Sequence, residues 1–110
     1  MSRRKRYIKG NVYLINDSLI VKNNKPNRRV VALNNDKESV HIRRITKVSN
    51  GGRNARKGTP IEKYPDIPHQ SVVENKTYRK TLRGKPIKAK QMRKTRTRLN
   101  KWDMKKILKK

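Results

Sequence analysis

Apolar residues in the first half of the chain occur in short runs separated by polar turns, a pattern typical of β-strands. Residues 30–33 (Val-Val-Ala-Leu) form a continuous apolar run, which predicts a strand buried on both faces. The polar loop 34–38 follows, rich in Asn and Asp that tolerate tight turns. Residues 39–46 then alternate between apolar and polar, which predicts a second strand. The stretch 27–47 therefore predicts an antiparallel hairpin around which the rest of the fold is organised.

Shorter apolar runs and polar breaks continue on both sides of this hairpin. Val and Ile at alternating or consecutive positions favour strands, whereas Gly, Pro, Asn and Asp favour turns and loops. In chain order, the pattern predicts strands over 11–15, 19–21 and 71–73, a turn over 16–18, irregular loops over 22–27 and 48–60, and a hairpin turn around 83–86. The fold class expected from these elements is mainly β.

The end of the chain predicts a short helix. Asn100 resembles an N-cap, and Asp103 follows three residues later, which is the capping-box spacing with Asp in place of Glu. We expect four apolar residues to pack along one side of it: Leu99, Met104, Ile107 and Leu108. A chain without Phe needs its other aromatic residues in the core, so we expect Tyr13 and Trp102 to be buried rather than stacked on nucleic-acid bases.

The charge of the chain points to its class of partner. The 110 residues include 33 Lys and Arg against 7 Asp and Glu, which leaves a formal net charge of +26. Such a surface repels itself unless a polyanion neutralises it, so we expect nucleic acid rather than a merely solvated cationic face. Phosphate contacts alone do not distinguish RNA from DNA. Membrane binding would require a basic helix with a wide apolar face, and only the short C-terminal segment is a candidate.

The composition excludes several other classes of function. The chain has no Cys and two His, which rules out disulfides and thiolate zinc sites and leaves too few ligands for a histidine-only metal site. We therefore expect no metal and no cofactor. No apolar segment suits a secretory signal or a membrane span, so we expect a cytoplasmic protein. Residues 1–6 predict a basic flexible arm and 7–110 one small domain, whose modest core would gain stability from a homodimer or a bound partner.

The central hairpin gathers candidate chemistry at one of its ends. Antiparallel pairing places the start of the first strand beside the end of the second. That end would carry four arginines and a hydroxyl, a set able to hold a phosphodiester: Arg28, Arg29, Arg43, Arg44 and Thr46. His41 lies in the second strand, where it is either a neutral packed histidine or a general acid or base acting on the phosphate.

Further basic residues lie beyond the hairpin. The loop after it combines glycines with cations that could close over a nucleic-acid backbone, and residues 75–102 contain twelve basic residues and no acid. The candidates for nucleic-acid contact in these segments are Arg53, Arg56, Lys57, Arg79, Lys80, Arg83, Arg93, Arg96 and Arg98.

Several short motifs, taken in order, resemble the PemK/MazF family of toxin ribonucleases. The matching segments are Tyr-Ile-Lys-Gly-Asn-Val-Tyr at 7–13, Arg-Arg-Val-Val at 28–31, Ile-Arg-Arg-Ile-Thr at 42–46, Gln-Ser-Val-Val at 70–73 and Leu-Asn-Lys-Trp-Asp at 99–103. The resemblance implies a small SH3-like barrel, metal-independent RNA cleavage by attack of the ribose 2′-OH, and an acidic antitoxin as partner. It also implies that Arg28 and Thr46 flank the reacting phosphate.

Three functions are consistent with these features. The resemblance favours an endoribonuclease. The excess charge, together with Arg29 and Arg44 at positions where the family has Pro, favours a non-catalytic RNA-binding protein on the same fold. One form of it would be an inhibitor that captures a structured RNA, as some anti-CRISPR proteins of mobile elements do with guide RNA. A ribonucleoprotein component is the third reading.

Overall fold

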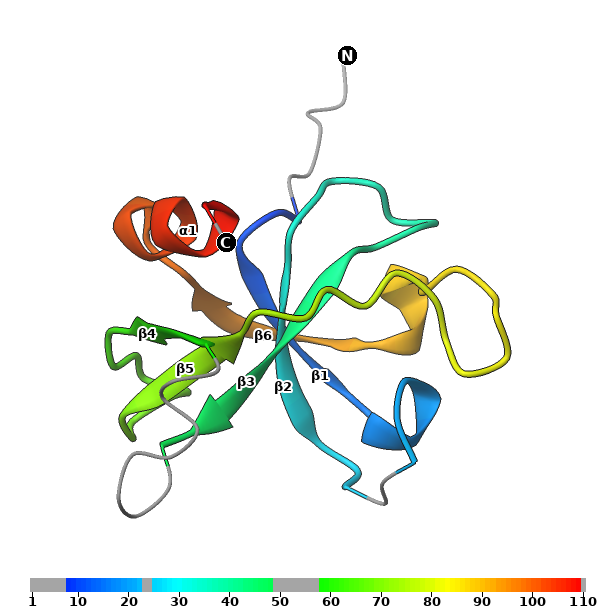
Figure 1. Cartoon of the computed structure of the whole chain (residues 1–110), viewed down its shortest axis with the longest axis horizontal. Coiled ribbons are helices and arrows are strands. Elements are labelled where there is room, and N and C mark those ends of the chain that lie inside the picture. Colours follow the sequence, from blue (N-terminus) through cyan, green and yellow to red (C-terminus); the bar gives the residue numbers. More distant parts are fainter. Residues whose placement is uncertain (1–7, 23–24, 49–57, 110) are drawn as a thin grey trace.

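A computed structural model describes residues 8–22, 25–48 and 58–109, which form one antiparallel sheet and a C-terminal helix (Figure 1). The strand order is β4-β5-β3-β2-β1-β6. The elements are β1 (Asn11–Ile15), the 3-10 turn η1 (Asp17–Leu19), β2 (Arg28–Ala32), β3 (Ile42–Lys47), β4 (Gly58–Ile61), β5 (Ser71–Glu74), the 3-10 turn η3 (Ala89–Gln91), β6 (Arg93–Arg98) and helix α1 (Lys101–Leu108). The predicted class, mainly β with a short C-terminal helix, is confirmed.

The central hairpin forms as predicted, with β2 between β1 and β3. Its buried run pairs Val30 with Arg44 and Val31 with Arg43. The second strand begins three residues later than expected, because the Asn34 side chain organises the connecting loop. Its amide donates to the carbonyl of Ser39 at 2.9 Å and its oxygen accepts from the backbone NH of His41 at 2.9 Å. These bonds hold the residues before β3 in a turn.

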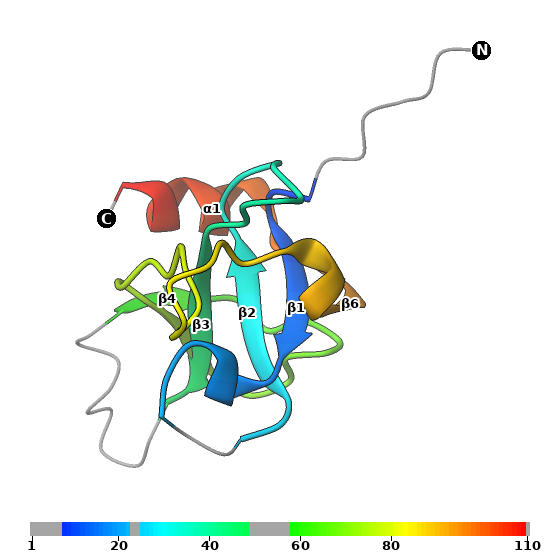
Figure 2. The same cartoon turned by 90° about the vertical axis from the view of Figure 1, so that its right-hand side faces the viewer.

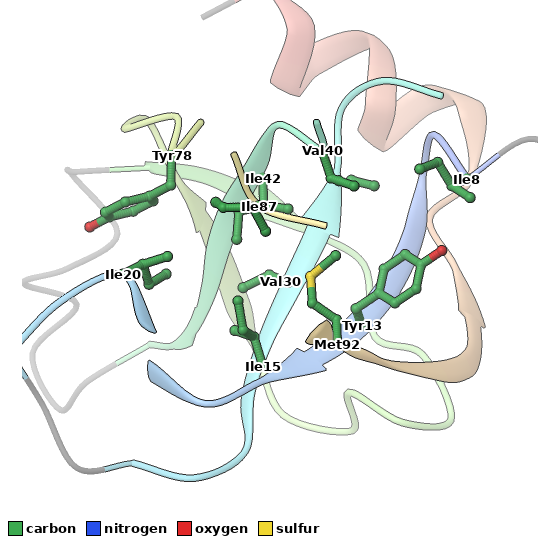
Figure 3. Packing of buried hydrophobic residues seen from close by; sticks show 11 residues of the cluster. Ile8, Tyr13, Ile15, Ile20, Val30, Val40, Ile42, Tyr78, Ile87 and Met92 are labelled. Carbon is green, nitrogen blue, oxygen red and sulfur yellow. The ribbon is translucent and has the colours of Figure 1, made fainter. Parts of the chain in front are cut away.

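Alternate residues of the strands contribute to two separate hydrophobic cores, one on each face of the sheet. Figure 3 shows the first core, which includes Ile8, Tyr13, Ile15, Ile20, Val30, Ala32, Val40, Ile42, Tyr78, Ile87 and Met92. The segment 75–92 crosses this face in front of β3, β2 and β1 (Figure 1). The second core includes Val12, Val31, Ile45, Ile61, Ile67, Val73, Leu99, Met104 and Ile107, and α1 packs on that face. Both cores draw on β1, β2 and β3, which explains why their apolar runs are continuous.

Helix α1 begins with the predicted cap. The Asn100 side chain accepts from the backbone NH of Asp103 at 2.8 Å. The carboxylate of Asp103 does not return to the Asn100 backbone but accepts from the Tyr64 hydroxyl at 2.6 Å, while that hydroxyl accepts from the Asn100 NH at 3.0 Å. Tyr64 thus completes the capping box as an intermediary, which explains how Asp replaces the longer Glu. Met104 and Ile107 are buried as expected, whereas the predictions for Trp102 and Leu108 are wrong: both are exposed.

Two predicted segments, 19–21 and 58–60, differ in the structure, and a third, 93–98, is an additional strand. Residues 19–21 do not form a strand, because Asn16 caps η1 and the chain turns back on itself. Residues 58–60, assigned to a loop by their Gly and Pro, belong to the edge strand β4 (Gly58–Ile61). Gly58 approaches β5 so closely that an added Cβ would lie 2.4 Å from the carbonyl oxygen of Val73, and Pro60 is tolerated because an edge strand leaves unpaired NH positions.

The basic segment 93–98 is the other edge strand, β6. Its threonines lie at alternate positions, with Thr97 buried and its neighbours Arg96 and Arg98 exposed. Period-two alternation of a β-branched residue with arginine is the sequence signal that identifies this strand. The predicted turn at 83–86 is confirmed by the Thr81–Lys85 hydrogen bond and the Lys80–Pro86 bridge.

The SH3-like barrel stays a prediction. In the part of the chain that the structure describes, no strand pairing joins the edge strands β4 and β6. Within the same residues, no helix has both the length and the apolar character needed to cross a membrane.

Candidate nucleic-acid interface

Two of the predicted arginines meet at the predicted end of the hairpin, and a buried carboxylate lies between them. Arg28 enters β2 and Arg44 lies within β3 on the same face of the sheet. Asp17 of η1 is fully buried, and its Oδ2 lies 3.3 Å from Nη2 of Arg28 and 3.2 Å from Nη2 of Arg44. We call Asp17, Arg28 and Arg44 the arginine cluster. The sequence offered no acid close to Arg28, and the fold supplies one from eleven positions away.

The rest of the arginine cluster's surroundings also hold Arg44 in place. Its Nη1 lies 3.5 Å from Oε1 of Glu74. Burial alone would lower the pKa of Arg44, but the Tyr78 hydroxyl and the two carboxylates of Glu74 and Asp17 raise it above its ordinary value. A guanidinium with this many partners is fixed in position. It has little capacity left to neutralise a ligand's phosphate.

Arg43 lies on the opposite face from its neighbour, because successive strand residues point to opposite sides of a sheet. Its side chain is buried, and Nε donates to Oγ1 of Thr77 at 3.0 Å while Nη1 donates to the carbonyl of Ile107 at 2.9 Å. Burial lowers the pKa of this guanidinium. Arg43 therefore ties α1 to the sheet, and the structure does not bring it to the strand end with Arg28.

The two other predicted catalytic residues lie at different ends of the hairpin. Thr46 follows Arg44 by two positions on the same face of β3, but the pairing with β2 ends at Arg44 and Thr46 pairs with Val72 of β5. Its Oγ1 is buried and has no hydrogen-bond partner among the described residues. His41 lies at the loop end, five residues from Thr46, which corresponds to about 17 Å along an extended strand. Arg28 and Thr46 thus lie at the same end of the hairpin, and His41 lies at the other end.

A pocket of about 150 Å³ opens at the same strand ends. The residues that line it are Lys25, Asn27, Arg28, Arg29, Ile45, Lys47, Ile67, Pro68, His69 and Ser71. We call it the strand-end pocket. None of these lining residues is acidic, whereas five carry or can carry a positive charge. Arg29 is exposed, and it has no side-chain hydrogen bond or ion pair within the described ranges.

Sequence reasoning missed part of this pocket. It predicted Arg28 and Arg29, but it assigned no site to Lys25, Lys47 or His69. Their association depends on the pairing of β3 with β5, in which Lys47 lies opposite Ser71 and brings the loop at 67–70 alongside. The predicted strand at 71–73 was the one sequence signal for this association, and the sequence of a strand does not show which other strand it pairs with.

The remaining predicted contacts are spread over other surfaces. Arg79, Lys80 and Arg83 are exposed on the 75–92 segment, whose turn lies on the right in Figure 1, whereas β6 passes behind the central strands of the sheet in that view. Arg93 hydrogen-bonds Asn27, while Arg96 and Arg98 are exposed along the β6 edge. Arg53, Arg56 and Lys57, like the basic arm at 1–6, lie outside the described residues. Over the described ranges, no three His, Cys, Asp or Glu side chains gather into a metal-binding group.

Comparison with known proteins gives no relative. No family model matches the chain, and neither a curated protein nor a solved structure matches it. The resemblance to PemK/MazF ribonucleases therefore stays a prediction from short motifs. The geometry and charge of the arginine cluster and the strand-end pocket are therefore the basis for assigning a function.

Proposed function

We propose that this protein binds RNA in the cytoplasm and holds the phosphate backbone at the strand-end pocket. The observation that carries the proposal is the lining of that pocket, where Lys25, Arg29, Lys47 and His69 gather with no carboxylate among the described lining residues. In a chain with only seven acids, such a cavity presents a positive field at a concave surface.

The types of residue in the pocket suit a phosphodiester. The planar guanidinium of Arg29 can donate two parallel hydrogen bonds to phosphate oxygens, whereas the ammonium groups of Lys25 and Lys47 act as point charges. Arg28 borders the pocket but is paired with Asp17, so it positions the strand end rather than supplying free charge. Binding through such contacts releases counterions and weakens steeply as salt rises.

Phosphodiester cleavage is the second candidate, and the placement of Arg28 and Thr46 at the same end of the hairpin favours it. An arginine oriented by a buried carboxylate is held where it could stabilise charge developing on a phosphate under attack by the ribose 2′-OH. The Thr46 hydroxyl is buried and has no hydrogen-bond partner among the described residues, so it would donate a further hydrogen bond only to a phosphate that displaces its cover. Non-catalytic capture of a structured RNA requires only the pocket, because it needs no activated oxygen.

One experiment separates binding from cleavage. Purified protein is incubated in EDTA with single-stranded and hairpin RNA, and cleavage and binding are followed together for the wild type, Arg28→Ala, Thr46→Ala and Arg29→Gln. Capture predicts intact RNA whose affinity falls steeply with salt and is reduced by Arg29→Gln. Cleavage that persists in EDTA and disappears in Arg28→Ala and Thr46→Ala would establish the nuclease instead.

The controls address folding and total charge. Circular dichroism checks each variant, because Arg28→Ala leaves Asp17 with Arg44 as its remaining ion-pair partner in the arginine cluster. Lys37→Gln removes one exposed cation from the loop at the far end of the hairpin. If wild-type protein binds no RNA even at low salt, the proposal is wrong.

A further inference from the structure

Helix α1 carries an exposed aromatic ring on a rigid support. Trp102 is 69% exposed, the largest exposure among the large apolar side chains in the described ranges. The helix beneath it is held by the Asn100 cap, by Arg43 on the Ile107 carbonyl and by Lys106, whose Nζ donates to the Pro60 carbonyl at 3.0 Å. The indole is therefore presented to solvent from a fixed element rather than from a loose terminus.

A groove opens along the same helix. It has a volume of about 470 Å³ and is lined by Lys9, Gly10, Arg98, Leu99, Lys101, Met104 and Lys105. We call it the α1 groove. Leu99 and Met104 give it an apolar floor, four cations surround the floor, and the described lining contains no acid. Lys105 lies three residues after Trp102, which on a helix places the two side chains next to each other at the rim.

We infer that the α1 groove and Trp102 together bind unpaired nucleotides of a single-stranded RNA, with one base on the apolar floor and a neighbouring base stacked on the indole. This inference rests on the proposed function and adds to it a preference for unpaired bases, which phosphate contacts in the strand-end pocket do not supply. Aromatic rings on a basic surface are the usual platform for splayed bases, whereas a duplex keeps its bases stacked inside.

Charge complementarity selects the occupant of the groove. A second copy of the chain brings the same net charge of +26 and is repelled. A nucleotide, by contrast, combines a flat apolar base with a phosphate on either side, and the groove combines an apolar floor with a rim of four cations. An acidic peptide would satisfy the rim but would leave the floor and the indole without a flat ring to contact.

The test separates base contacts from phosphate contacts. Fluorescence anisotropy measures binding of labelled dodecauridylate and of an abasic ribose-phosphate strand with the same number of phosphates. Trp102→Ala should weaken binding of dodecauridylate about tenfold and leave binding of the abasic strand unchanged. Since Trp102 is the one tryptophan of the chain, its intrinsic fluorescence should be quenched by dodecauridylate and not by the abasic strand.

A matched control and a second ligand make the result decisive. Leu82 is 55% exposed on the 80–86 turn, which lies away from α1 (Figure 1). Leu82→Ala therefore controls for a non-specific loss of exposed apolar area. It should change the affinity neither for dodecauridylate nor for the abasic strand. Equal losses for both strands, or an equal loss in Leu82→Ala, would overturn the inference. If Trp102→Ala weakened the binding of polyglutamate tenfold and left the binding of dodecauridylate unchanged, the occupant of the α1 groove would be an acidic protein. That result would also overturn the inference.

The same measurements distinguish this inference from the proposed function. If the wild type binds neither strand at low salt, both are wrong. If it binds both strands equally, with steep salt dependence and no effect of Trp102→Ala, RNA binding by phosphate contacts stands and the base-binding role of α1 fails.

Discussion

The arginine cluster and the strand-end pocket lie next to each other and use the same residue type in opposite ways. In the cluster, Arg28 and Arg44 surround the fully buried Asp17. In the pocket, Lys25 and Arg29 share a concave surface whose described lining has no acid. Arginines that pair with one of the few carboxylates therefore stabilise the fold, whereas cations in the acid-free pocket can bind a ligand.

A second acid-centred site follows the same rule at the other end of the molecule. Asp103 is buried in the first turn of α1, accepts from the Tyr64 hydroxyl and the Glu62 backbone NH, and pairs with Lys106 at 3.3 Å. The acid-free α1 groove opens on the same helix. Figure 2, a side view, shows α1 and the turn η1 at opposite ends of the sheet, so each end carries one buried acid. Buried carboxylates fix the scaffold, and the surfaces without them are left cationic.

Removing the acid from the arginine cluster should have the largest effect. Asp17→Asn leaves two largely buried arginine side chains without their shared carboxylate, which we expect to lower the free energy of unfolding by about 3–5 kcal/mol. Urea denaturation followed by circular dichroism measures this. Glu38→Gln makes the same change in net charge at an exposed loop position and should alter stability little. Equal effects of the two variants would show that Asp17 acts only through total charge.

Tyr64 offers a smaller effect with a defined pH dependence. Tyr64→Phe removes a donor from the buried Asp103 and an acceptor from Asn100, which should cost about 1–3 kcal/mol. Burial, followed by the hydrogen bond to Asp103, raises the pKa of Tyr64 to about 12. Because the folded state holds this proton more tightly than the unfolded chain, the stabilisation is full below pH 10 and is lost as the pH rises toward 12.

Thermal unfolding of the wild type and Tyr64→Phe between pH 8 and about 12 tests the cap network. The difference between the two should shrink across the upper part of this range, since the lysines that titrate there are common to both proteins. A constant difference would mean that the Tyr64 hydroxyl contributes through packing and not through its proton.

The smallest effect is expected at the pocket itself. Arg29→Gln should leave stability unchanged and weaken RNA binding several-fold, with the slope of log K against log salt reduced by about 0.7 for a single strand. Lys37→Gln, an equal loss of charge at the far end of the hairpin, should reduce affinity less. Titrations at four salt concentrations give both slopes, and identical slopes would remove the special role of the pocket.

Local signals in the sequence predicted the scaffold well. The run at 30–33 and the polar loop after it gave the central hairpin, and Asn100 with Asp103 gave the start of α1. Strand β6 escaped prediction because an edge strand buries only alternate residues, so Thr95 and Thr97 alone marked it among arginines. Trp102 was expected in the core because a chain without Phe needs its other aromatic residues there, but composition does not show which side of a short helix faces the sheet.

The sequence by itself determined the charge, the β-rich class and the capped terminal helix, because composition, apolar runs and capping residues act over a few neighbouring positions. Only the tertiary structure determined which group each arginine side chain binds. Arg43 and Arg44 are adjacent, yet one bonds a carbonyl 64 positions away and the other a carboxylate 27 positions away. A cation's role depends on which acid or carbonyl the fold brings to it, and that long-range pairing has no local signal.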